Sequence, residues 1–249
     1  MRWLWLDVGA RVRARTTMIA LAMLAYALVG LPFLLSKPPE HVEEALLGWF
    51  GTAERFQLFL YLWTDVAMNK VFGLLAVILA GQTLVQERDM GVLDVLRSKP
   101  VSLRDLFLVR AASAIVVLWG LYALTALVGV VWFSWAVEGF RPGVFLVSSL
   151  VHAGAVGFGG ALAATLAVVL ARRTMGLVVS LIVVFSLMGG AFLGFYNPAW
   201  AGVAMINPFA LGVQAVGHAA DLRVEHVVPP LLGTLAATAL TLADRKSVV

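Results

Sequence analysis

The 249-residue chain contains no cysteine, and only 13% of its residues are charged. The missing cysteines exclude disulfides, thiolate nucleophiles and cysteine-ligated metal or iron–sulfur centres. A soluble domain normally carries about twice this charged fraction. Because 61% of the residues are hydrophobic and the mean hydropathy is +0.95, a single core cannot hold all of the apolar residues. The composition therefore predicts an all-α, polytopic membrane protein.

The sequence also lacks the short motifs of common enzymes and nucleotide-binding proteins. It has no G-x-x-x-x-G-K-[ST] phosphate-binding loop, no H-E-x-x-H zinc motif and no G-x-S motif of a serine hydrolase. Gly157, Gly159 and Gly160 lie among apolar residues without a lysine, so they favour close helix packing over phosphate binding. We therefore expect no catalytic, cofactor-binding or metal-binding residue. The net charge of +4 fits basic loops near lipid and does not indicate nucleic-acid binding.

Six hydrophobic stretches predict membrane spans within a single transmembrane domain of residues 1–249. They cover residues of about 17–35, 67–85, 106–136, 144–170, 175–195 and 226–243. The preceding residues, Met1 to Arg15, mix apolar side chains with four arginines, which is typical of an interfacial helix. No clear cleavage site follows the first stretch, so we expect an uncleaved span. The second stretch begins near Val66, which places Asp65, Asn69 and Lys70 near one membrane surface.

Basic residues are distributed unevenly between the two sides that six spans define. Thirteen of the 18 lysines and arginines fall on the side of the two termini, and five fall on the other. Since basic loops are retained in the cytoplasm, both termini are expected to be cytoplasmic in a multi-pass protein of the cell (cytoplasmic) membrane. The fourteen acidic residues fall outside the predicted hydrophobic cores, which argues against a proton-coupled carrier.

The longest polar interruption between two spans is Glu87–Arg104, with the sequence ERDMGVLDVLRSKPVSLR. Gly91 permits a sharp turn, and Pro100 ends a short helix. The apolar residues share one side of that helix: Met90, Val92, Leu93 and Leu96, with Val101 as a further candidate. The opposite side is expected to be polar: Asp89, Asp94 and Arg97. Such a helix can dock in a groove of a partner protein or rest on lipid headgroups. The residues alone leave both interpretations open.

This segment resembles the cytoplasmic segment of ABC-2-type ABC transporter permeases, whose pattern is close to E-R-x-x-G-T-L-x-x-L-x-S-x-P-V-S-R. Val92 stands where threonine is usual, and Leu103 stands where arginine is usual, with Arg104 one residue later. The resemblance implies a coupling helix that docks on a separate ATP-hydrolysing subunit. The residues that it assigns to this docking are Glu87, Gly91, Val92, Leu93, Leu96 and Pro100.

The resemblance further implies an exporter that works by alternating access, with ATP and magnesium bound by the partner subunit and no cofactor on this chain. One chain supplies six spans, so a second copy or a related permease is expected as partner. Short re-entrant helices are expected at Ala199 to Met205 and Pro208 to His218. Asn69, Gln82 and Thr83 are candidates for polar groups in a mostly apolar path. The alternatives are an ion-coupled secondary transporter and a membrane enzyme.

Histidine and acidic residues leave two further choices open. His152, in the fourth predicted span, is expected to be hydrogen-bonded within the helix bundle and not to bind a metal. Four residues before the last span either lie in a solvated loop or form a loose metal site: His218, Asp221, Glu225 and His226. Asp65 and Lys70 are expected to form an ion pair at the membrane surface and not a proton relay.

Overall fold

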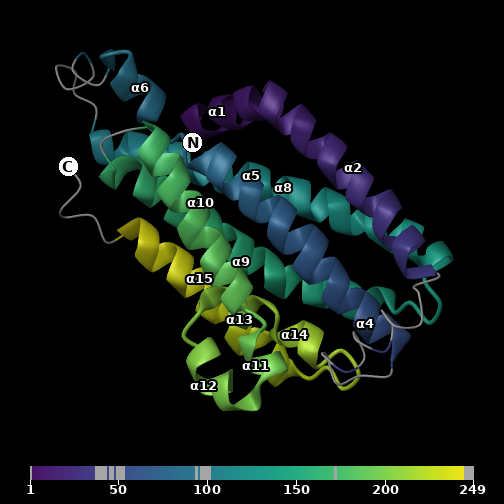
Figure 1. Ribbon diagram of the computed structural model, residues 1–249. Coiled ribbons are helices and arrows are strands. Elements are labelled where there is room, and N and C mark those ends of the chain that lie inside the picture. The colour runs from purple at the N-terminus through teal and green to yellow at the C-terminus, as the bar shows by residue number, and fades with distance from the viewer. Residues whose placement is uncertain are drawn as a thin grey trace.

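A computed structural model describes residues 2–36, 44, 48, 54–92, 95, 102–170 and 173–243. All of the secondary-structure elements in this part of the chain are helices, which confirms the all-α prediction (Figure 1). The elements are α1 (Arg2–Val12), α2 (Arg15–Ser36), α4 (Arg55–Leu62), η1 (Trp63–Asn69), α5 (Lys70–Ala80), α6 (Val85–Asp89), α8 (Leu103–Ala136), α9 (Pro142–Val169), α10 (Arg173–Gly190), α11 (Leu193–Tyr196), η2 (Pro198–Trp200), α12 (Ala201–Ala204), α13 (Pro208–Gly212), α14 (Gln214–Gly217), η3 (Val224–His226) and α15 (Val228–Ala243).

Several of these helices are compatible with a protein embedded in a membrane. Among the described residues, four stretches are long and apolar enough to span one: Arg55–Ala80, Leu103–Ala136, Pro142–Val169 and Val224–Ala243. Parts of α1 and α2, Leu4–Val12 and Thr17–Gly30, pass the same test only as a pair, and they meet at an angle of 59°. The apolar part of α10, Thr174–Gly190, is shorter. The count of six spans therefore stays a prediction.

The second long helix begins earlier than the sequence suggested. Helices α4, η1 and α5 run without a break from Arg55 to Ala80. The middle part, η1, is a π-helix, in which each hydrogen bond closes over five residues. Asp65 and Lys70 are five positions apart, so the π-helical hydrogen-bond pattern brings them together. The Lys70 ammonium donates to the Asp65 carboxylate at 2.9 Å. The helix therefore continues through the polar residues that were expected to mark its outer end.

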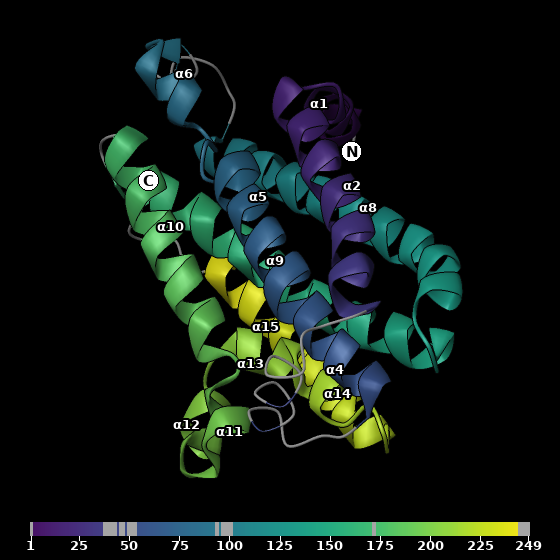
Figure 2. The same cartoon turned by 45° about the vertical axis from the view of Figure 1, so that its right-hand side comes forward.

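Helix α9 forms the centre of the bundle and packs against α5, α8, α10, α13 and α15 (Figures 1 and 2). Small residues permit these contacts. A Cβ atom added at Gly157 would lie 2.8 Å from the Trp119 indole of α8. A Cβ atom added at Gly154 would collide with the Thr234 hydroxyl of α15. The glycines from Gly154 to Gly160 therefore serve close helix packing, as the sequence predicted.

The bundle has two distinct ends. Helices α1 and α6 lie at one end, and α15 runs back toward that end (Figures 1 and 2). The short helices α11 to α14 lie at the other end, where α4 begins. Helices α13 and α14 occupy one of the segments predicted to be re-entrant, and both pack against α9. Phe209, Val213 and Val216 are fully buried there.

Candidate functional site

The predicted docking element begins at the end of the bundle that carries α1. After α5 ends, the Thr83 hydroxyl donates to the Ala80 carbonyl at 2.6 Å, and the chain turns through Leu84 into α6. Gly91 follows α6 with φ of +68°. This left-handed backbone conformation favours glycine, since a side chain there would be strained. Glu87, Gly91 and Val92 are described, whereas Leu93, Leu96 and Pro100 lie outside the described residues.

Glu87 belongs to a cluster of polar side chains that joins α1, α6 and α8. The members of this end cluster are Asp7, Arg11, Glu87, Arg110 and Ser113. Arg110 contacts the Glu87 carboxylate at 2.7 Å and also pairs with Asp7, which is 8% exposed. The Ser113 hydroxyl donates to Asp7 as well. The guanidinium of Arg110 therefore connects the start of the docking element to two other helices.

Arg11 of α1 points into the same cluster. Its guanidinium donates to Asp7 at 2.9 Å and to the Leu79 carbonyl at 2.6 Å. The sequence had suggested that the arginines of α1 face lipid headgroups. Arg11 instead holds α1 against the end of α5, because the carbonyl groups in the last turn of a helix lack partners within the helix.

A second arginine ties α6 to another part of the bundle. The Arg88 guanidinium donates to the Leu170 carbonyl, at the end of α9, at 3.2 Å. Glu87 and Arg88 are neighbours, so adjacent side chains fix α6 to α8 and to the end of α9. The start of the predicted docking element is therefore anchored to the two longest helices of the described part of the chain.

The three polar residues suggested for a translocation path occupy different environments. Thr83 is buried and caps the end of α5, as described above. Gln82 lines a polar cavity of about 230 Å³ beside the end cluster. Asn69 is buried in the bundle interior. The three side chains thus take part in different contacts, and their role in a path stays a prediction.

Asn69 takes part in a buried chain of hydrogen bonds across three helices. The His152 ring of α9 contacts the Asn69 amide oxygen through Nε2 at 2.8 Å. It contacts the Tyr122 hydroxyl of α8 through Nδ1, also at 2.8 Å. With Nε2 protonated, His152 donates to Asn69 and accepts from Tyr122, so a neutral ring satisfies both contacts. His152 is thus hydrogen-bonded within the bundle, as predicted.

The two other described histidines lie close together near the start of the last long helix. The rings of His218 and His226 stack at a centroid distance of 3.7 Å and an interplanar angle of 8°. Partial burial lowers the pKa of His218, and the neighbouring His226 acts in the same direction. A hydrogen bond from Arg223 lowers the pKa of Asp221. In the described part of the chain, no group of three or more histidine or acidic side chains is placed to hold a metal ion.

Comparison with known proteins does not assign a function to these residues. The chain matches no protein-family model, and it matches no curated protein. The fold therefore defines a class only: an all-helical protein with several apolar helices that are compatible with a membrane.

The contacts that sequence analysis missed are those between distant segments. Arg110 was counted only among the thirteen basic residues on the side of the termini, and its pairing with Asp7 spans 103 positions. The one available signal was the presence of Asp7 within an otherwise apolar and basic N-terminal helix. A single acid of that kind indicates a specific partner, because burying an unpaired carboxylate is costly.

Proposed function

We propose that this chain is the transmembrane permease subunit of an ABC-2-type exporter. A separate subunit would hydrolyse ATP and bind the magnesium ion, and a second copy or a related permease would complete the transporter. The proposal rests on the residue pattern of Glu87–Arg104, which resembles the coupling segment of that family. The left-handed backbone at Gly91 supports it, because this turn gives a physical reason for the glycine of the pattern.

The anchoring of α6 supports a mechanical role for the segment. A docking helix transmits the closure of an ATPase only if it is fixed to the membrane helices behind it. Glu87 pairs with Arg110 of α8, and Arg88 donates to the end of α9. A movement imposed on the segment would therefore reach α8 and α9. In the proposed topology this segment and both termini face the cytoplasm.

One observation favours a second candidate, an ion-coupled secondary transporter. Polar residues inside a membrane bundle often mark proton or substrate pathways. The Asn69–His152–Tyr122 chain is such a feature. In the described part of the chain, none of these three side chains forms a hydrogen bond or ion pair with a carboxylate, and a structural role in joining three helices accounts for them. Transport into proteoliposomes driven by a pH gradient without ATP would favour this candidate over the first.

The docking assignment is tested by copurification of the chain with its ATPase partner. Leu93→Asp and Leu96→Asp place a charge on the predicted apolar side of the docking helix. We expect both variants to insert into the membrane and to lose the ATPase. Asp94→Lys, on the side expected to be polar, serves as the control and should retain it. If both aspartate variants retain the ATPase, the segment is not the docking element.

A further inference from the structure

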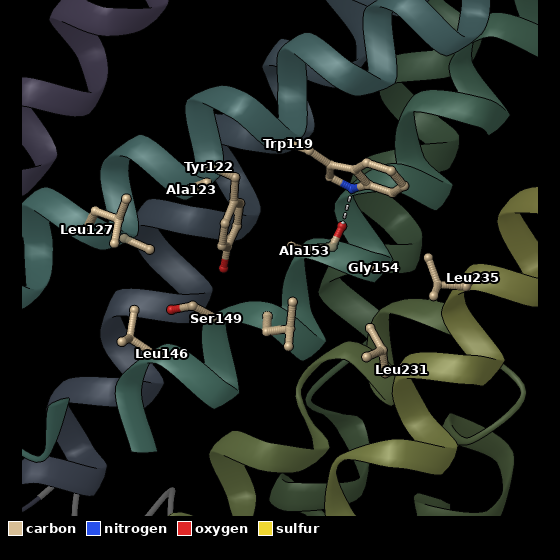
Figure 3. Close-up of a pocket in the computed structure, with 12 residues that line it drawn as sticks. Trp119, Tyr122, Ala123, Leu127, Leu146, Ser149, Ala153, Gly154, Leu231 and Leu235 are labelled. Atoms are coloured by element: carbon tan, nitrogen blue, oxygen red, sulfur yellow. Dashed lines mark hydrogen bonds between the residues drawn. The ribbon is translucent and has the colours of Figure 1, made fainter. Parts of the chain in front are cut away.

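A large apolar cavity lies between α8, α9 and α15 (Figure 3). Its volume is about 510 Å³, which is within the range of about 300–1,000 Å³ typical of ligand pockets. Trp119 and Tyr122 of α8 line one wall, and Ala153 of α9 lies between the two flanking helices. Leu231 and Leu235 of α15 form the opposite wall. Helices α8 and α15 both pack against α9 and leave this space between them.

The polar groups of the cavity wall are engaged within the protein. The Trp119 indole donates to the Ala153 carbonyl at 2.8 Å, as Figure 3 shows. The Tyr122 hydroxyl contacts His152 at 2.8 Å. None of the described residues that line the cavity is charged. Electrostatic complementarity therefore favours an uncharged, apolar occupant.

The cavity lies at the depth of lipid hydrocarbon and opens to the outside of the bundle. Leu231 and Leu235 are seven and eleven residues from the start of the candidate span Val224–Ala243. At 1.5 Å per residue, this depth is about 10–17 Å, which is within a hydrocarbon layer of about 30 Å. At the rim, Leu127 is 60% exposed and Leu150 is 56% exposed. The surrounding hydrocarbon therefore has direct access to the cavity.

We propose that this cavity binds a hydrocarbon chain of a membrane lipid. An empty apolar void forfeits packing contacts, and the loss grows with its volume. A flexible hydrocarbon chain fits a hollow between three helices. The proposal concerns lipid binding by the membrane bundle and does not depend on the proposed export function.

The test uses the full-length chain in nanodiscs of phosphatidylcholine with a photoreactive diazirine in one acyl chain. After irradiation, the sites of attachment are mapped by mass spectrometry. We expect at least fivefold more attachment at cavity residues such as Trp119 and Leu127 than at the exposed face of α10, at Val178 and Ile182. Equal attachment at the two places would overturn the proposal.

Filling the cavity provides the matched comparison. Ala123 lines the cavity and is exposed, so Ala123→Leu should fill it and reduce attachment there at least fivefold. Ala236 is exposed on α15 outside the cavity, so Ala236→Leu should leave attachment unchanged. Leu150→Trp fills the same space from α9 and replaces Ala123→Leu if that variant does not fold. Unchanged attachment in the filled variants, or coverage of the cavity by a second copy, would contradict the proposal.

Discussion

Asn69, His152 and Tyr122 show how single polar side chains are accommodated within the apolar bundle. Each one comes from a different long helix, and the histidine links the other two. Interhelical hydrogen bonds of this kind contribute about 0.6 kcal/mol on average in membrane proteins, and up to about 1.7 kcal/mol. The chain therefore both satisfies buried polar groups and fixes the relative positions of η1, α8 and α9.

Removal of the Tyr122 hydroxyl tests this role. Tyr122→Phe leaves His152 Nδ1 without its partner, so we expect a loss of about 0.6–1.7 kcal/mol in the free energy of unfolding. The measurement is equilibrium unfolding of the purified protein in mixed micelles. Tyr26→Phe is the control, since Tyr26 is 81% exposed on α2. Equal stability of the two variants would show that the chain does not stabilise the bundle.

The stacked histidines predict a pH dependence at the other end of the molecule. Burial and His226 lower the pKa of His218 below its ordinary value of 6.5, and Asp221 and Glu225 oppose the shift. Folding therefore favours neutral His218. Its contribution to stability is complete above pH 6.5 and declines as the pH falls through the lowered pKa.

Histidine NMR signals measure this shift directly. We expect His218 to titrate below pH 6.5 in the intact protein and to shift upward in His226→Gln, because the neighbouring positive charge is then absent. A titration of His218 at or above pH 6.5 in the unmodified chain would contradict this interpretation.

The sequence predicted the surroundings of only one of these side chains and none of their partners. The apolar surroundings of His152 indicated a hydrogen-bonded residue inside the bundle. Its partners could not be deduced, because Asn69 is 83 positions away and Tyr122 is 30 positions away. The spacing of His218 and His226 gave no signal of stacking, since the contact depends on how the chain folds between α14 and η3.

At the scale of helices, the structure differs from the prediction where polar side chains find a partner within their own helix. Asp65 and Lys70 suggested a membrane boundary, yet their ion pair lies within one continuous helix that contains a π-helical segment. The predicted stretches 106–136 and 144–170 agree closely with the bounds of α8 and α9, because each long apolar run follows an extended residue, Ser102 or Arg141. The Ser102 hydroxyl accepts from the Asp105 amide and so marks the start of α8.

Arg110 connects α6 to α8 and α1, so its substitution should loosen the attachment of α6. In Arg110→Gln the ion pairs with Glu87 and Asp7 are lost. We expect amide hydrogen exchange in Val85–Asp89 to become about tenfold faster, which corresponds to about 1.4 kcal/mol. Arg104 is exposed and lies on α8, as Arg110 does. Arg104→Gln should therefore leave the exchange of Val85–Asp89 unchanged. Unchanged exchange in Arg110→Gln would mean that the end cluster does not hold α6.

For the whole molecule, composition predicted the helical class and compatibility with a membrane, because apolar content of this magnitude exceeds the capacity of one soluble core. Four long apolar helices agree with that prediction. The packing of α13 and α14 against α9 could not be deduced, because hydropathy does not distinguish a buried short helix from a surface loop.

In the proposed topology, Glu87–Arg104 faces the cytoplasm, opposite the turn between α8 and α9. The natural absence of cysteine allows single cysteines to report the side directly. Met90 is 60% exposed after α6, and the Glu138 side chain is 83% exposed at the opposite end. We expect a membrane-impermeant maleimide to label Glu138→Cys in intact cells and Met90→Cys only after the membrane is permeabilised. Labelling of Met90→Cys in intact cells would contradict the account.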